Sequence, residues 1–103
     1  MSHFQVREYD RLAEDGNGNI ISAGREPAVA TQTITTSGTS QASSTFNART
    51  RFLFIESDGI VNWDVGTSPT AVVGGAGKMP ANSARFVGIM PNASLKIAVI
   101  NDT

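Results

Sequence analysis

The chain of 103 residues contains no cysteine and a single histidine, His3. The absence of cysteine excludes disulfides, thiolate zinc sites, iron–sulfur clusters and cysteine nucleophiles. A serine hydrolase would also lack support here, because the one histidine lies near the start and no Gly-x-Ser-x-Gly sequence occurs. The sequence therefore contains little of the usual chemistry of an enzyme.

An excess of positive charge is also missing. Eight Lys and Arg stand against nine Asp and Glu, a net charge of −1, whereas nucleic-acid modules normally carry a basic face. No apolar run approaches the roughly 20 residues of a membrane helix, and the first residues show no basic stretch followed by an apolar one. We therefore expect no nucleic-acid partner, no membrane partner and no secretory signal.

The residues that are abundant favour β structure. The chain has ten Ser, ten Thr, ten Gly and seven Asn but only three Leu, a composition typical of strands joined by turns. Short apolar or alternating runs recur between turn residues roughly every 8–12 positions, and no amphipathic helical spacing is sustained. These features predict an all-β fold, a small antiparallel β-sandwich or a jelly-roll-like barrel.

The strongest candidate for the core is the apolar run Phe52-Leu53-Phe54-Ile55. Four consecutive large residues predict a central strand covered on both faces, with residues 60–65 returning as its hairpin partner. We expect Phe52, Phe54 and Trp63 in or beside the core. An exposed Trp63 would instead indicate a carbohydrate-stacking platform.

Residues 1–27 differ from residues 28–103. They hold five acidic and three basic residues, which are costly to bury unless paired. They also hold four side chains too apolar for a solvated tail: Phe4, Val6, Tyr9 and Leu12. The sequence predicts a β-sandwich over 28–103 and an N-terminal arm or hairpin over 1–27. As an arm, it would bind a partner through those four side chains; as a hairpin, it would turn at residues 15–18.

Two turn sequences resemble ligand loops only in part. Asp15, Asn17, Asn19 and Glu26 have the oxygen spacing of a calcium loop, but the sixth position is Ile20 instead of Gly. The glycine-rich stretch 74–78 ends in Gly-Lys but lacks the earlier Gly and the following Ser or Thr of a phosphate loop. Turn chemistry explains both, and we expect no metal and no cofactor.

Three carboxylates provide the remaining option for catalysis. Glu56 and Asp58 lie two residues apart, and Asp64 lies on the predicted partner strand. Glycosidases use two carboxylates across a sugar-sized cleft, although charges near a hairpin end are usually solvated. We expect no catalytic residues.

The second half of the chain has a distinctive order of segments. A polar stretch at 40–51 precedes the apolar strand, and three short motifs follow: Val65-Gly66-Thr67-Ser68-Pro69-Thr70-Ala71, Met79-Pro80-Ala81-Asn82-Ser83 and Ala93-Ser94-Leu95-Lys96-Ile97-Ala98-Val99-Ile100. Over roughly residues 29–100 this order resembles small β-rich virion proteins of tailed bacteriophages.

The resemblance implies a non-enzymatic capsid decoration or cement subunit. Such a subunit is made in the bacterial host cytoplasm and binds the major capsid protein on the outer surface of the virion, as a homotrimer. The apolar run 86–90 also favours self-association, because it exceeds what one small core can cover. Two other classes stay open: a receptor- or carbohydrate-binding module of a phage tail fibre, with Trp63 and loop 74–78 at its tip, and a small hydrolase using the three carboxylates.

Overall fold

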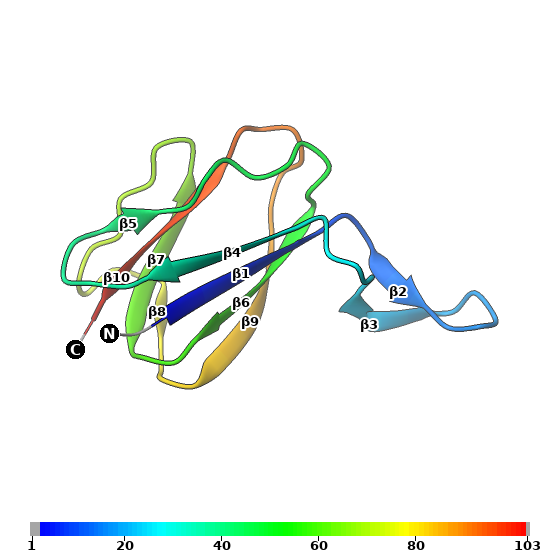
Figure 1. Ribbon diagram of the computed structural model, residues 1–103, viewed down its shortest axis with the longest axis horizontal. Coiled ribbons are helices and arrows are strands. Elements are labelled where there is room, and N and C mark those ends of the chain that lie inside the picture. The colour runs from blue at the N-terminus through cyan, green and yellow to red at the C-terminus, as the bar shows by residue number, and fades with distance from the viewer. Residues whose placement is uncertain (1–2, 103) are drawn as a thin grey trace.

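The computed structural model describes residues 3–102, apart from the side chain of Ser22, as β-strands joined by turns and loops (Figure 1). Two four-stranded antiparallel sheets pack face to face, and a two-stranded hairpin projects from one end. This arrangement confirms the predicted all-β fold and its sandwich character. Residues 3–102 contain no helix, and so none that is long and apolar enough to cross a membrane.

The first sheet has the strand order β4-β1-β6-β9. Its strands are β1 (His3–Tyr9), β4 (Ala30–Thr35), β6 (Phe52–Ser57) and β9 (Ser83–Gly88). Every neighbouring pair is antiparallel, and β1 is hydrogen-bonded on both sides, to β4 and to β6. The N-terminal strand is therefore an interior strand of this sheet.

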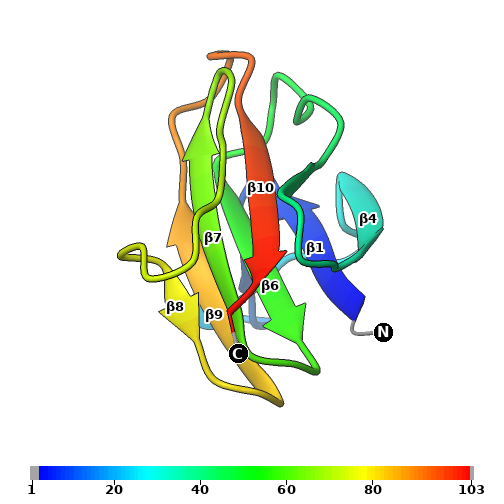
Figure 2. The same cartoon turned by 90° about the vertical axis from the view of Figure 1, so that its left-hand side faces the viewer.

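The second sheet has the order β5-β10-β7-β8. Its strands are β5 (Gln41–Ala42), β7 (Val61–Gly66), β8 (Lys78–Met79) and β10 (Lys96–Asn101). Figure 2 shows β7 and β10 in front of the first sheet. Both faces of β10 are buried: Ile97 and Val99 enter the main core, whereas Ala98 and Ile100 join Ala71 in a small second cluster. The loop that contains Ala71 thus covers the outer side of this sheet.

The main core lies between the two sheets. Alternate residues of the strands supply it, as expected for sheets with one face buried. Its buried members are Phe4, Val6, Ile34, Phe46, Leu53, Ile55, Val61, Met79, Ile97 and Val99.

The predicted division into an arm over 1–27 and a sandwich over 28–103 does not hold, because β1 is an interior strand of the sandwich. Phe4 and Val6 have no exposed surface and pack in the main core. Gln5 and Arg7, which alternate with them, are exposed on the outer face. Charge in this segment therefore does not oppose burial of the strand, because a strand sends successive side chains to opposite faces.

We expected β6 to be covered on both faces, but only its inner face is fully buried. Leu53 and Ile55 are fully buried in the core, but Phe52 and Phe54 point to the outer face of the first sheet and are only half-buried. Trp63 packs partly buried against the main core, as expected of a residue beside it.

One buried carboxyl group connects separate parts of the fold. Glu8, 1% exposed, faces inward from β1. Its Oε1 accepts hydrogen bonds from the Asn47 amide and the Thr50 hydroxyl, both at 2.8 Å, and its Oε2 accepts one from the Gln32 side chain at 3.2 Å. Burying such a group requires these partners, and they come from β4 and from the loop before β6.

We expect Glu8→Ala to lower the free energy of unfolding by about 3 kcal/mol, because it leaves the Asn47 amide and the buried Thr50 hydroxyl without an acceptor. Glu8→Gln keeps one acceptor oxygen and should cost about half as much. Urea unfolding monitored by Trp63 fluorescence measures both. Glu14→Ala, at an exposed position, is the control; an equal loss for both alanine variants would contradict this role.

Leu53→Ala should cost about 2–5 kcal/mol, as removal of a fully buried side chain does. Phe54→Ala should cost only about 1–2 kcal/mol, since its ring contacts lie on the open face. The same unfolding measurement compares the two variants. A larger loss of stability for Phe54→Ala than for Leu53→Ala would show that the inner and outer faces of β6 are assigned the wrong way round.

Candidate functional site

The projecting hairpin consists of β2 (Leu12–Glu14) and β3 (Ile20–Gly24), paired antiparallel with an irregularity in the register. Three large aliphatic side chains on it are exposed: Leu12 by 39%, Ile20 by 70% and Ile21 by 45%. A surface of this kind on a projecting element is typical of a contact with another molecule.

The tip of the hairpin is held by Asp15. Its Oδ1 accepts hydrogen bonds from the backbone amides of Asn17 (2.8 Å) and Asn19 (3.0 Å), and its Oδ2 accepts one from the Asn19 side chain (3.2 Å). These bonds, from Asn19 first and then Asn17, lower the pKa of Asp15. The carboxylate thus has the turn role that Asp commonly has. Glu26 lies at the hairpin base, bonded to Tyr9, so the four residues with calcium-loop spacing are not brought together.

The base of the hairpin is fixed to β1 through Glu26. Its Oε2 accepts hydrogen bonds from the Tyr9 hydroxyl at 2.6 Å and from the Arg7 guanidinium at 3.2 Å. Its Oε1 accepts one from the Ala28 amide at 3.1 Å. The Tyr9 hydroxyl, followed by the Arg7 charge, lowers the pKa of Glu26; burial, followed by the bond to Glu26, raises the pKa of Tyr9.

Packing at the same base restricts its movement further. A Cβ atom at Gly24 would collide with the Tyr9 ring, so β3 lies directly on that ring. Asp10 pairs with Arg25 at 3.6 Å and Arg49 at 3.9 Å. We call this set of contacts around Tyr9 and Glu26 the hairpin base; it holds the hairpin in one direction relative to the sandwich.

The four candidate partner-binding residues therefore have different locations. Phe4 and Val6 are in the main core, and Tyr9, 4% exposed, belongs to the hairpin base. None of these three is available to a partner. Leu12 alone is on the exposed hairpin.

The outer face of the first sheet carries an aromatic cluster. Phe54 and Phe86 are paired across β6 and β9, with ring centroids 4.8 Å apart. Phe52 lies 5.7 Å from Phe86 and stacks on Tyr9 at 5.4 Å. Phe86 is 50% exposed. We call Phe52, Phe54 and Phe86 the aromatic patch.

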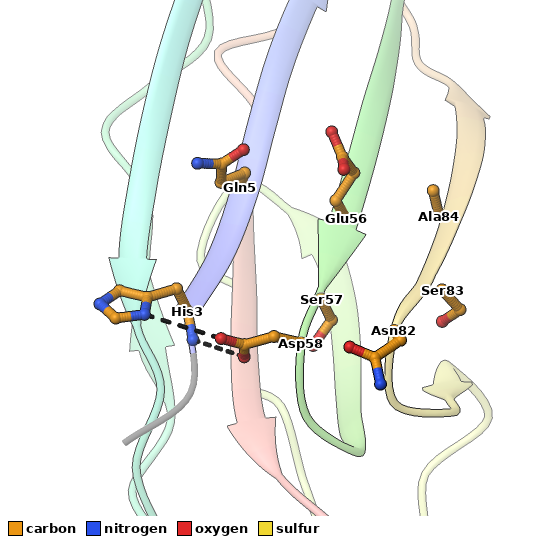
Figure 3. Close-up of a pocket in the computed structure, with 8 residues that line it drawn as sticks. All are labelled: His3, Gln5, Glu56, Ser57, Asp58, Asn82, Ser83 and Ala84. Atoms are coloured by element: carbon orange, nitrogen blue, oxygen red, sulfur yellow. Dashed lines mark hydrogen bonds and ion pairs between the residues drawn. The ribbon is translucent and has the colours of Figure 1, made fainter.

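A polar groove of about 560 Å³ adjoins the aromatic patch on the same face (Figure 3). It is lined by His3, Gln5, Glu56, Ser57, Asp58, Asn82, Ser83 and Ala84. The register explains this neighbourhood: Gln5, Glu56 and Ala84 form the cross-strand row next to the row of Arg7, Phe54 and Phe86. Asp58 accepts a hydrogen bond from the His3 backbone amide at 2.7 Å and lies 3.7 Å from the His3 Nδ1.

The three carboxylates considered for catalysis are separated. Glu56 and Asp58 line the groove, whereas Asp64 is exposed on β7 of the second sheet. The groove therefore holds two of the three carboxylates, and the third is not brought to it.

The glycine-rich loop 74–78 is anchored by side chains of the second sheet and of the segment after it. The Asn62 side chain donates to the Gly75 carbonyl at 2.7 Å and accepts from the Gly77 amide at 3.2 Å. Asp102 accepts from Asn62 at 3.1 Å and from the Gly74 amide at 3.2 Å, and these bonds lower its pKa. A Cβ at Gly77 would collide with the Trp63 backbone. The loop thus lies against β7.

Sequence reasoning missed the aromatic patch, although a signal was present. Phe52, Phe54 and Glu56 are two residues apart along the strand and so lie on the same face. The charge of Glu56 indicates that this face is solvated. Phe86 was noted only as part of an apolar run. Comparisons with protein families, with curated proteins and with solved structures found no match to this chain.

The lowered pKa of Glu26 predicts a pH-dependent contribution to stability. A carboxyl group with a depressed folded pKa stabilises above its unfolded pKa, about 4.3, and loses that contribution as pH falls through the folded value. Wild-type protein should therefore melt at a higher temperature than Glu26→Gln at pH 7, and the difference should shrink as the pH falls below about 4.3. Glu14→Gln is the control on the exposed hairpin strand. A difference that does not change with pH would contradict the role of the Glu26 charge.

Proposed function

We propose that this chain is a non-enzymatic structural subunit of a tailed-phage virion, of the capsid decoration or cement type. In this role it binds the major capsid protein on the outside of the shell. The resemblance over roughly residues 29–100 supports the class of protein. The observation that carries the proposal is the hairpin, which projects beyond the sandwich (Figure 1) and has exposed aliphatic side chains.

The hairpin has the properties of an attachment element. Leu12, Ile20 and Ile21 expose apolar surface that a partner can bury, at roughly 25 cal/mol per Å². The hairpin base holds them in one direction, so little conformational freedom is lost when they dock. This surface takes over the partner-binding role that the sequence suggested for Phe4, Val6 and Tyr9.

Two rival functions have weaker support. The hydrolase hypothesis placed Asp64 with Glu56 and Asp58, but Asp64 lies on the other sheet. The tail-fibre hypothesis placed Trp63 and loop 74–78 at a binding tip; the two do lie together, but Trp63 is partly buried against the main core. We therefore favour the structural role.

We extend the proposal to a homotrimer. The apolar run 86–90 supports this, because Met90 at its end is 72% exposed and offers apolar surface to a second copy. Light scattering of the purified chain across micromolar to millimolar concentration tests this part, and a monomer throughout would contradict it.

Attachment is tested with a triple variant, Leu12→Ser, Ile20→Ser and Ile21→Ser. Because these side chains are exposed, the sandwich should keep its melting transition while binding to shells of the major capsid protein falls at least about tenfold. The matched control is Val72→Ser with Val73→Ser, at positions 55% and 63% exposed beside the second sheet. Equal binding by the two variants, or no binding of wild type to shells, would contradict the proposal.

A further inference from the structure

The polar groove and the aromatic patch together have the composition of a saccharide site. Pyranose rings have one apolar face that stacks on aromatic side chains, and they carry hydroxyl groups around their edge that bind carboxylates and amides. On this sheet the rings of Phe54 and Phe86 occupy one cross-strand row, and Gln5 and Glu56 occupy the next. Neighbouring rows place the two kinds of contact within reach of one sugar chain.

Among the residues that the structure describes, three polar side chains of the groove make no hydrogen bond to the protein and can bind a ligand. No hydrogen bond within residues 3–102 uses the side chains of Gln5, Glu56 or Asn82. Gln5 and Asn82 each present two donors and an acceptor, and Glu56 presents two acceptor oxygens. They come from β1, β6 and the turn before β9, and all three line the groove (Figure 3).

The charges of the groove select among saccharides. Its lining includes the carboxylates of Glu56 and Asp58 and no Lys or Arg. Arg7 lies in the neighbouring cross-strand row of the same face, opposite Phe54. Its guanidinium donates a hydrogen bond to Glu26 at 3.2 Å. Carboxylates repel uronic, sialic and sulfated sugars, so the groove fits an uncharged chain. Its volume of about 560 Å³ falls within the roughly 300–1,000 Å³ of small-molecule sites.

We propose that the groove and the aromatic patch bind a neutral oligosaccharide. Phe54 and Phe86 stack on the apolar face of a ring, and Gln5, Glu56 and Asn82 bind its hydroxyl groups. The groove lies at the start of β1, at the end of the sandwich away from the hairpin (Figure 1), and the aromatic patch extends from it toward Tyr9. None of the five residues named here is on the hairpin itself.

The test is isothermal calorimetry of the full chain with three probes: the β-1,4-linked tetrasaccharides of glucose and of N-acetylglucosamine, and tetragalacturonate as the charged comparison. We expect at least one neutral probe to bind with a Kd of about 1 mM or tighter, and tetragalacturonate to bind at least about tenfold more weakly.

Two variants locate the site. Phe86→Ala removes a half-exposed ring from an edge strand, and Asn82→Gly removes an amide at a backbone φ of +54°, which glycine adopts without strain. Each should weaken neutral binding by about tenfold, with an unchanged melting temperature for Asn82→Gly. Val73→Ala, an exposed position beside the second sheet, should bind as wild type does.

Three results would overturn the inference: no binding of either neutral probe, preference for tetragalacturonate, or wild-type affinity in both site variants. Shell binding by the same variants separates this outcome from the proposed function. Phe86→Ala and Asn82→Gly should attach to shells normally, because neither residue is on the hairpin.

Discussion

The buried carboxyl group of Glu8 is the interaction on which one end of the sandwich depends. Strand pairing connects β1 to β4 and β6, but it does not order the loop from Ser43 to Thr50. That loop reaches across to the second sheet, where the Ser43 amide donates a hydrogen bond to Ile97 of β10 and the Phe46 amide donates one to Leu95, the residue before β10. By accepting from Asn47 and Thr50, Glu8 joins the centre of one sheet to a segment bound to the other. The two layers are thereby coupled by polar contacts as well as by the core.

Composition and alternation were sufficient to predict the β fold, but not the position of its first strand. The error came from treating the charge of residues 1–27 as a property of the whole segment. In β1 the charge of Arg7 belongs to the outer face, while Phe4 and Val6 belong to the inner one. Glu8 follows the same alternation but places a charged side chain on the inner face, and its partners lie 24 to 42 residues away. A single sequence does not indicate which distant donors will meet a buried carboxyl group.

The binding surfaces could be predicted only in part for the same reason. The turn at residues 15–18 is local, because the Asp15 side chain bonds to residues two and four positions later, and its chemistry is readable from the sequence. The groove instead joins His3, Glu56 and Asn82 through two strand pairings of long separation. The surroundings of Trp63 could not be predicted either, because they depend on Gly77, fourteen residues later, packing against the Trp63 backbone.

The lengthwise arrangement of the molecule has a practical consequence. The structure is 46 Å long, with the hairpin at one end and both marked chain ends at the other (Figure 1). A copy fixed to a surface by its hairpin would direct any polypeptide fused to either end outward, clear of the contact. The fold thus has the geometry of a display scaffold, in which cargo and anchor are separated by the length of the sandwich.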